Sequence, residues 1–449
     1  MSLVIKNNMS AINTLNIMSK NNKALSSSLQ KVSTGQKINS AADDPAGYAI
    51  SQRMQTQIRS LDQDNDNAAN GQNMLKTAEG AVSSTVDILK TLKEKVLDAA
   101  NDTNTTYDRN TIQDYLDQAV DQINDNATTT YNGKLLVDGS MNQASTTGAT
   151  VVYTNESLDT ATSFSSNLTD LLDRNGNSLN ILDADTVTIS YVSNGKTMTT
   201  SFSASGATLA SVFMNSQSAT GASVDGFGNG NLLTGADAGS FIGLNAQGVS
   251  VYTADGSSVL SVSSTKSGVG GNIAGFTISI TGTDGNVKKS VNTTLDAWSE
   301  QISASDQSND NSITLQVGTK ANQSIRVGLG DMRAQALGLQ GVSADGSVQN
   351  LDVSTRDNAN AAINVLDNAV QKSLSQQTKI GSVESRLDYT QDNLTTQSEN
   401  VQSSESTITD ANMAEEMTEY TKNNVLAQAS QAMLAQANSS SQNILQLLQ

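Results

Sequence analysis

The stretch from Lys31 to Ser51 reads KVSTGQKINSAADDPAGYAIS and contains the only proline among the 449 residues, Pro45. Long runs without glycine or proline lie on both sides of it. Either aspartate of the Asp43–Asp44 pair can cap the helix that follows, and proline is tolerated in a first helical turn because its missing N–H would have no partner there. The stretch therefore predicts a loop, Ser33–Asp44, that separates two long helices. Its candidate inter-domain residues are Gly35, Ile38, Asn39, Asp43, Asp44 and Pro45.

Apolar residues before this break recur mostly every three, four or seven positions, as on one face of a helix. The last helix, expected from Met413 to within one residue of the C-terminus, carries a similar stripe. An isolated helix of about thirty residues is marginal in water, so both stripes need to be covered. The candidate residues of a subunit interface are Ile5, Met9, Ile12, Leu15, Leu25, Leu29, Val32, Met413, Met417, Leu426, Met433, Ile444 and Leu448.

Three further helices are expected between these ends. One runs from Pro45 to about Ala100, and a shorter one runs from Arg109 to Ala127. The third, Thr355–Thr409, carries apolar residues at every seventh position, which predicts a left-handed seam with partner helices. These positions are Ile380, Leu387, Leu394, Val401 and Ile408.

The middle of the chain, 144–311, is rich in glycine, serine and threonine and shows the alternation of strands. Two hairpins are predicted, one turning at Asn194–Gly195 and one at Asp284–Gly285. Both begin with Thr-Ile-Ser and reach Thr-Leu, which indicates an internal duplication. We therefore expect two lobes, at about 144–225 and 226–311.

A further hairpin, 313–331, precedes the C-terminal helices and is assigned to the helical body. The expected fold is mostly α: a helical rod of coiled-coil or bundle type formed by both chain ends, with an inserted β-rich α+β domain. A pair of terminal helices leaves apolar surface uncovered, and copies of the same pair could cover it. Contacts between different surfaces of successive copies do not close and build a filament. Two alternatives stay open, a monomeric helical rod and a dimeric coiled coil, each with a β-domain at its tip.

Composition excludes several classes of function. The net charge is −18, so a basic groove for nucleic acid is not expected. Cysteine and histidine are absent, which excludes disulfides, thiolate nucleophiles, Cys/His zinc sites and imidazole bases. A carboxylate-only site stays formally open, although Asp43–Asp44 fits capping better. No apolar run of about 18 residues and no basic secretory leader occurs, so we expect no membrane insertion, and we assign no catalytic residue, cofactor or metal.

The opening stretch strongly resembles the N-terminal signature of bacterial flagellins, the subunits of the flagellar filament. The resemblance continues through AISQRMQTQIRSLDQDNDNAANGQNMLKTAEGAV and TTYNGKLLVDG. It returns in LQVGTKANQSIRVGLGDMRAQALGL, which is similar to the flagellin β-hairpin, and in the residues from Arg386 to Leu448, which are similar to the flagellin C-terminus. It covers roughly residues 1–140 and 312–449. The segment between them matches no flagellin motif, as expected of the variable, exposed domain of the family.

The resemblance implies different structural roles for different segments of the chain. Residues 1–42 and 406–449 would form the inner tube (the D0 type of domain), 43–143 and 312–405 the outer tube (D1), and 144–311 the surface-exposed insertion. The implied function is a structural subunit that polymerises into the filament used for swimming, and not an enzyme. The implied partners are further copies of the chain, an export chaperone, the filament cap and the hook–filament junction proteins. The implied location is extracellular, after type III export without a cleaved signal peptide.

Two expectations depend on carrying family residues over one by one. Many flagellins activate the innate Toll-like receptor 5 through a helix reading roughly Leu-Gln-Arg-Val-Arg-Glu-Leu. The equivalent here reads LKTLKEK, and a glutamate expected in the next helix is a tyrosine, so we expect weak activation. The many serines and threonines of the insertion also resemble flagellins that carry O-linked sugars. The residues of the receptor region are Lys90, Thr91, Lys93, Glu94, Lys95 and Tyr115.

Three other interpretations compete with a filament subunit. A hook–filament junction protein shares the terminal helices, but the 313–331 hairpin and the Asp43–Gly47 loop favour flagellin. Flagellins with a metalloprotease in the variable domain use His-Glu-x-x-His, which a chain without histidine does not contain. An adhesive filament subunit stays open because Gly/Ser/Thr-rich β-lobes often bind sugars, although no ligand is indicated.

Overall fold

The computed structural model describes residues 8–145, 148–193, 195–212, 241–253, 258–264, 266–342 and 347–447, with side chains described as far as residue 440. The chain divides into two compact units. The first comprises residues 1–69, 316–323 and 389–449, and the second comprises residues 70–315 and 324–388. The boundaries fall inside two long helices, α2 (Pro45–Ala99) and α6 (Arg356–Thr409), so each unit contains part of both helices.

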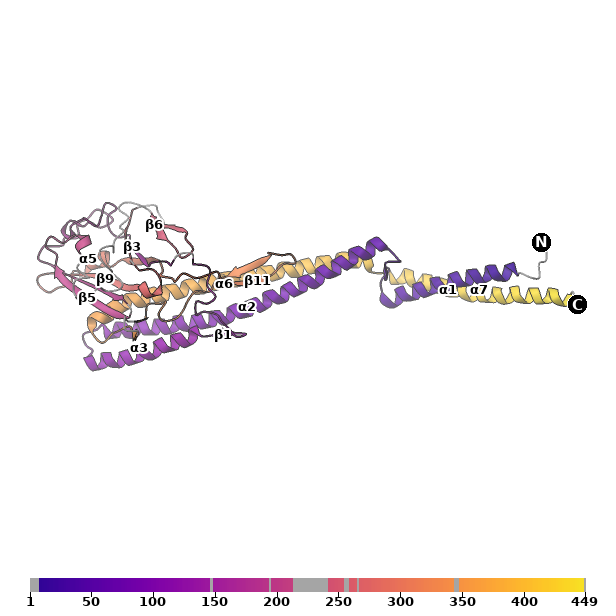
Figure 1. Cartoon of the computed structure of the whole chain (residues 1–449), viewed down its shortest axis with the longest axis horizontal. Helices are drawn as coiled ribbons and strands as arrows, with labels where there is room; N and C mark the ends of the chain where they lie inside the picture. The colour runs from indigo at the N-terminus through magenta and orange to yellow at the C-terminus, as the bar shows by residue number, and fades with distance from the viewer. Residues whose placement is uncertain are drawn as a thin grey trace. The chain divides into compact units, whose positions relative to one another are not determined.

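The first unit contains a pair of terminal helices. α1 (Met9–Thr34) and α7 (Met413–Leu447) run side by side, as the indigo and yellow helices of Figure 1 show. The side chain of Asn8 accepts the N–H of Ala11 at 3.1 Å, which satisfies one of the free donors at the start of α1. Helices are therefore formed at both chain ends, where the apolar periodicity predicts them.

The α2 and α6 helices have almost the length expected from the sequence, because each starts or ends at a clear local signal. Pro45 begins α2, and the helix ends at Ala99. The two helices run antiparallel, since residues further along α2 bond to earlier residues of α6. Three side-chain bonds of 3.0, 3.2 and 2.5 Å, each inside one unit, join them: Gln55–Glu405, Asp62–Ser398 and Gln72–Asp388.

The helical core of the second unit is built from large aliphatic side chains. It comes from the later part of α2, from α3 (Thr106–Ala127) and from the earlier part of α6. Of the seven-residue series on α6, two members in this unit are completely buried. The side chains with no exposed surface include Leu75, Leu89, Leu116, Ile123, Leu366, Ile380 and Leu387.

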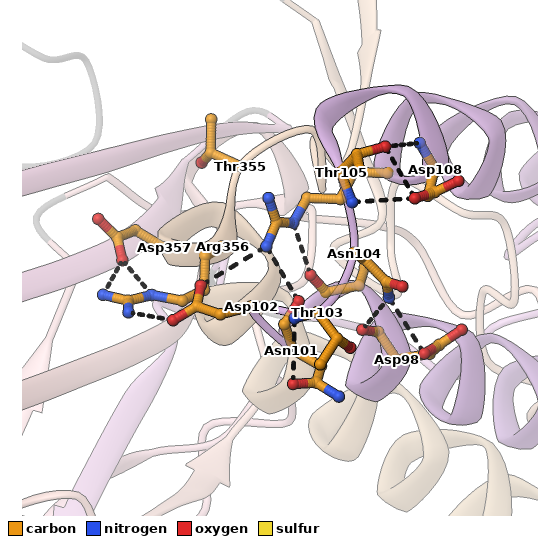
Figure 2. A network of polar contacts seen from close by, with 12 residues as sticks. Asp98, Asn101, Asp102, Thr103, Asn104, Thr105, Asp108, Thr355, Arg356 and Asp357 are labelled. Carbon is orange, nitrogen blue, oxygen red and sulfur yellow. Dashed lines mark hydrogen bonds and ion pairs between the residues drawn. The ribbon is translucent and has the colours of Figure 1, made fainter.

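The turn between α2 and α3 carries a polar network (Figure 2). The guanidinium of Arg109 donates to the carbonyl oxygen of Ala99 at 2.9 Å and so caps the end of α2. Asp102 lies between two guanidinium groups, 3.0 Å from that of Arg356 and 3.7 Å from that of Arg109. A capping box at Thr105 begins α3 three residues earlier than the sequence predicted, since that motif satisfies the first free N–H groups.

Short hairpins accompany the helices. β1 (Thr130–Tyr131) and β2 (Lys134–Leu135) flank Asn132–Gly133, where both φ angles are positive, as a tight hairpin turn requires. The hairpin predicted at 313–331 is confirmed as β11 (Ile313–Gln316) and β12 (Ser324–Val327). The remaining pair and the two 3-10 turns are β13 (Gln340–Val342), β14 (Val348–Asn350), η1 (Leu168–Asp170) and η2 (Val269–Gly271).

The first predicted hairpin of the insertion is confirmed. β4 (Thr186–Ser193) and β5 (Lys196–Ser203) pair along their whole length in antiparallel register. The third strand of this sheet is β9 (Ile273–Thr281), which pairs antiparallel with the other edge of β4. The sheet order is therefore β5-β4-β9, with strands from distant parts of the insertion as neighbours.

Of the second predicted hairpin, at Asp284–Gly285, only the turn is formed, closed by the N–H of Lys288, which donates to the carbonyl oxygen of Ile280 at 3.0 Å. After a single bridge back to β9 the chain enters a helix, α5 (Lys289–Leu295), in place of a second strand. The reason lies in the side chains of the helical segment. Asn292 accepts the N–H of Ile280 at 2.7 Å, and Asp296 accepts that of Ile278 at 3.0 Å, so side-chain oxygens take the edge donors of β9 that a second strand would have taken.

A second three-stranded sheet has the order β10-β3-β8, from β10 (Trp298–Ile302), β3 (Val152–Asn155) and β8 (Leu260–Ser263). A hairpin of β6 (Phe241–Leu244) and β7 (Ser250–Tyr252) accompanies it. Both sheets again combine strands from the two halves of the insertion.

One buried apolar cluster includes residues from 151–212 and from 260–295. It therefore draws on both of the candidate lobes, and the sheet β5-β4-β9 does the same. The two halves share a sheet and a core, in contrast to the two separate lobes suggested by the repeated sequence pattern. The expected division at 225/226 lies outside the described residues.

Candidate self-association surface

The seam between α1 and α7 includes hydrogen bonds between polar side chains. Asn21 donates to the hydroxyl of Ser430 at 2.7 Å, and Asn423 donates to the hydroxyl of Ser28 at 3.0 Å. Both serines are only 7 % exposed. Amide and hydroxyl groups thus satisfy each other between the helices.

The seam has a regular seven-residue spacing. On α1 and on α7, partly or fully buried positions recur alternately every three and four residues, as in a coiled coil. Near the base of the pair, Lys31 and Glu416 form an ion pair at 3.3 Å. The seam positions are Ala11, Thr14, Met18, Asn21, Leu25, Ser28 and Val32 on α1, and Glu416, Tyr420, Asn423, Ala427, Ser430, Leu434 and Ala437 on α7.

Ten other large apolar side chains lie outside this seam and are exposed. Met9 and Met433 keep 61 % and 62 % of their surface, and the remainder keep between 42 % and 59 %. We call this set the apolar outer surface. Its members are Met9, Ile12, Leu15, Ile17 and Leu29 on α1, and Met413, Met417, Val425, Leu426 and Met433 on α7.

Most of the interface residues predicted from the sequence belong to this surface. Leu25 and Val32 do not, because they are partly buried in the seam. Ile17 and Val425 were missed, although their large apolar side chains beside the predicted stripes were a usable signal. Ile5 and Leu448 lie outside the described residues, and for Ile444 only the helical backbone is described.

The loop after α1 joins the two chain ends by backbone bonds. Gly35 ends the helix in the left-handed conformation at φ 72°, which glycine adopts without strain. Its carbonyl oxygen accepts the N–H of Ala411 at 2.8 Å, and the N–H of Lys37 donates to the carbonyl oxygen of Thr409 at 2.7 Å. The segments before α2 and after α6 therefore pair with each other within the first unit.

The two aspartates in front of Pro45 have different roles. Asp44 accepts the N–H of Ala46 at 3.0 Å and is therefore the cap of α2. Asp43 accepts the N–H groups of Asn39 and Ser40 and the hydroxyl of Ser40, at 2.9–3.1 Å. The hydroxyl of Ser40, followed by these backbone donors, lowers the pKa of the Asp43 carboxyl. The pair thus shapes the loop and starts a helix.

At Gly47 the first turn of α2 packs closely against the loop that precedes it. A Cβ atom at this position would lie 2.5 Å from a carboxylate oxygen of Asp44 and 2.7 Å from the terminal methyl of Ile38. Ile38 is 8 % exposed and is the buried apolar residue of the loop. Only glycine allows the first turn of α2 to approach the loop this closely.

The receptor-region equivalents lie in the second unit, on α2 and α3. Lys90, Thr91, Glu94 and Lys95 are exposed on α2, and Tyr115 keeps 46 % of its surface on α3. Lys93 differs because it forms an ion pair with Asp367 of α6. The non-basic residue at Thr91 and the basic one at Lys95 therefore stand where a binding partner can reach them.

No cluster of three or more side chains able to ligate a metal occurs within the described ranges. Among the helices in those ranges, none combines the length and the apolar character needed to span a membrane. What the terminal helices do present is a set of ten exposed large apolar side chains. Exposed apolar side chains in such number are typical of a protein that associates with others.

Comparison with known proteins gives the family. A family described as "Bacterial flagellin N-terminal helical region" matches residues 5–142, and one described as "Bacterial flagellin C-terminal helical region" matches residues 363–448. A flagellin of Clostridium tyrobutyricum is 32 % identical over 445 residues, which cover 98 % of this chain and 100 % of that protein. The chain belongs to the bacterial flagellin family, and it is a structural subunit of the flagellar filament, the organelle of swimming motility.

Two further relatives extend over the whole chain. The flagellin of Bacillus subtilis (strain 168) is 28 % identical over 463 residues and covers 99 % of both chains. The B-type flagellin of Pseudomonas aeruginosa is 29 % identical over 490 residues and covers 100 % of both. The inserted segment is therefore aligned together with the terminal regions.

Proposed function

We propose that copies of this chain assemble through the apolar outer surface of α1 and α7, and that these helices form the inner tube of the filament. One observation supports the proposal above all others. Ten large apolar side chains are exposed on α1 and α7, outside the seam in which the two helices contact each other. Many exposed large apolar side chains on one pair of helices are rare on proteins that remain single, and they typically mark an interaction site.

The energetics favour this interpretation. Burial of apolar surface contributes about 25 cal/mol per Å², and a large aliphatic side chain contributes about 1.5–3 kcal/mol when it is fully covered. Hydrogen bonds of the Asn21–Ser430 kind contribute only about 1 kcal/mol net. Contacts with neighbouring copies can therefore stabilise the terminal helices more than their own seam does. Contacts between unlike faces of successive copies extend without closing, as a filament requires.

The domain roles follow from the same proposal. Residues 1–42 and 406–449 would form the inner tube, 43–143 and 312–405 the outer tube, and 144–311 the exposed insertion. The chaperone, cap and junction proteins that serve flagellins would then be its further partners, and export without a cleaved signal would place it outside the cell. Family membership supports these roles, and no observation on the described residues favours a junction protein or an adhesive subunit.

Assembly of purified chain tests the proposal. We expect Ile12→Ser combined with Leu29→Ser to raise the critical concentration for filament formation at least about tenfold, because two exposed side chains lose their burial between copies. Sedimentation and electron microscopy after seeding would measure it. Leu182→Ser is a matched control, since Leu182 is 59 % exposed but lies in the insertion. Unchanged assembly of the double variant would contradict the proposal.

Weak activation of Toll-like receptor 5 remains part of the proposal. It is supported by the exposed positions of Thr91, Lys95 and Tyr115, which differ from the residues expected of activating flagellins. A reporter-cell assay with the purified chain tests it, and a potent response would reject it.

O-linked sugars on the insertion are proposed on weaker grounds. Exposed hydroxyl side chains such as Thr199 and Ser201 on β5 would be available for modification. Mass spectrometry of the protein from its native source tests this, and a complete set of unmodified peptides would remove the proposal.

A further inference from the structure

An open pocket of about 500 Å³ lies within the first unit, between α2 and the tip of the β11–β12 hairpin. Hydroxyl, amide and charged side chains line most of it. The lining residues are Thr56, Arg59, Ser60, Gln63 and Asp64 from α2, and Gln316, Gly318, Thr319, Lys320 and Ala321 from the hairpin tip.

Asp64 is the unusual member of this lining. It is only 5 % exposed, and its Oδ2 atom is enclosed without a hydrogen-bond partner among the described residues. Burial raises the pKa of this carboxyl above its ordinary value. An enclosed carboxylate that lacks a donor or a cation is costly to the folded state, so a partner that reaches it would be stabilising.

Two basic side chains line the same pocket, and neither is paired with a carboxylate of the described residues. Arg59 and Lys320 are exposed, and neither forms an ion pair with another described residue. On the neighbouring part of α6, the groups bonded to α2 are Ser398 and Glu405, and their partners are residues other than Asp64. The candidates for a cation at Asp64 are therefore these two residues.

The hairpin tip holds the backbone of Lys320 in place. The N–H of Lys320 donates to the side-chain oxygen of Gln323 at 3.1 Å, and the side-chain amide of Gln316 donates to the carbonyl oxygen of Lys320 at 2.9 Å. Asn322 adopts a positive φ of 68° in the same turn. Because the backbone is fixed, only the flexible side chain has to move for the ammonium group to reach the pocket.

We propose that Lys320 and Asp64 form a latch that holds the hairpin tip against α2. The ammonium group of Lys320 is the cation that the enclosed carboxylate lacks. Arg59 could neutralise the same carboxylate, but it belongs to α2 itself and would not attach the hairpin. The latch acts within a single chain and is independent of the apolar outer surface, so it can fail while the proposed assembly holds, and the reverse.

A double-mutant cycle on the full chain tests the coupling. We expect Lys320→Met to lower the folding equilibrium constant about tenfold when Asp64 is present, and to have little effect in an Asp64→Asn background. Lys320→Arg keeps the charge and should retain most of the stability. Lys196→Met, at an exposed lysine of β5, is the matched control and should change little in either background.

Crosslinking supplies a readout that a general loss of stability would not mimic. The chain has no cysteine, so the pair Thr56→Cys and Ala321→Cys, placed on opposite sides of the pocket, can be joined cleanly by a short bismaleimide at neutral pH. We expect the within-chain product to form several-fold more slowly with Lys320→Met or Asp64→Asn, and at the parent rate with Lys320→Arg.

Three results would overturn the latch. The first is an equal effect of Lys320→Met in both Asp64 backgrounds, together with an unchanged crosslinking rate. The second is coupling of Asp64 to Arg59 in place of Lys320, measured with Arg59→Met. The third is coupling that appears only in sedimented assemblies, which would mean that a second copy of the chain supplies the cation.

Discussion

The α1–α7 pair and the helical core of the second unit use amphipathic helices in opposite ways. In the second unit, side chains such as Leu89, Leu116 and Ile123 have no exposed surface. In the α1–α7 pair, hydrogen-bonded serine and asparagine share the seam with partly buried apolar residues, and side chains such as Leu15 and Leu29 are about half exposed. The first arrangement is complete within one chain. The second leaves its apolar side chains uncovered until further copies are present.

The comparison teaches that a helical stripe does not by itself identify its partner. Both regions show apolar residues at helical spacing, and both form long helices. They differ in how completely the large apolar side chains are covered, since ten of them stay exposed on α1 and α7. Folding and assembly can therefore be perturbed separately in this chain.

The largest effect is expected from a cavity in the core of the second unit. Leu116→Ala should lower the free energy of unfolding by about 3 kcal/mol, because it removes completely buried methyl groups. Leu15→Ala is the matched variant on α1, where the side chain is 49 % exposed, and should cost less than about 0.5 kcal/mol in the unassembled chain. Urea denaturation of both variants measures the difference. Similar losses would contradict the distinction between the two regions.

Much of the helical architecture could be predicted from the sequence, because its signals are local. Pro45 and the Asp43–Asp44 pair mark the start of α2, and the seven-residue series on α6 identifies a helix whose observed bounds, Arg356–Thr409, differ by one residue from those predicted. The strands on either side of the dipeptide predicted to turn, Asn194–Gly195, likewise pair as β4 and β5. Each of these features is decided by residues close together in the chain.

The features that could not be predicted depend on distant partners. The pairing of β9 with β4 joins segments about eighty residues apart, and the choice of a helix after β9 depends on whether Asn292 and Asp296 cap its edge. The polar contacts in the α1–α7 seam were also missed, because the large apolar stripe beside them is the stronger periodic signal. The packing of the folded chain decides which of the two sets of residues, the stripe or the seam positions, faces the neighbouring helix.

Asp296 is a buried carboxyl of the insertion, and its burial makes stability depend on pH. Burial raises the pKa of Asp296 from 3.8 to about 7, although its side chain accepts the N–H of Ile278. The folded chain therefore binds this proton more tightly than the unfolded chain, so stability falls as the pH rises from about 4 to 7 and is then constant. Asp296→Asn should stabilise the chain by about 1–2 kcal/mol at pH 8 and by little at pH 4.

Thermal unfolding at both pH values measures this effect. Asp284→Asn is the opposite case, because the side-chain amide of Asn286, followed by its backbone N–H, lowers the pKa of Asp284. That carboxylate contributes stability at neutral pH which is lost as the pH falls, so its substitution should destabilise at pH 8 and have less effect at low pH. If Asp296→Asn gave the same change at pH 4 and pH 8, ionisation of the buried carboxyl would not be the cause.

The hydrogen bonds in the α1–α7 seam should contribute less free energy than is gained or lost in the Leu116 and Asp296 variants. We expect Asn21→Ala to weaken the pairing by about 1 kcal/mol, because the Ser430 hydroxyl loses its amide donor, and Asn21→Ala with Ser430→Ala to cost little more. Hydrogen exchange of the α1 amides in assembled filaments measures both. If the loss in the double variant equalled the sum of the losses in the Asn21→Ala and Ser430→Ala single variants, the bond would contribute nothing. Asn22→Ala, at the adjacent exposed position, serves as the control.

The smallest effect concerns charges along the α2–α6 contact of the second unit. Burial, together with the nearby carboxylates of Glu79 and Asp388, raises the pKa of Glu384, and Lys76 opposes the shift. The stability that comes with a bound proton is present at acid pH and is lost as the pH rises through this raised pKa. Glu384→Gln should therefore stabilise the chain at pH 7 by about 0.3–0.5 kcal/mol, as removal of a like-charge contact between helices does, and by less at pH 4.

Chemical denaturation at the two pH values measures the Glu384 effect, and Glu94→Gln on the exposed face of α2 is its control. Added salt should reduce the gain, because screening weakens the repulsion that the substitution removes. A gain that is independent of both salt and pH would assign the effect to packing. Even the well-covered helices of this chain would then be limited by side-chain fit and not by charge, which would narrow the contrast with the α1–α7 pair.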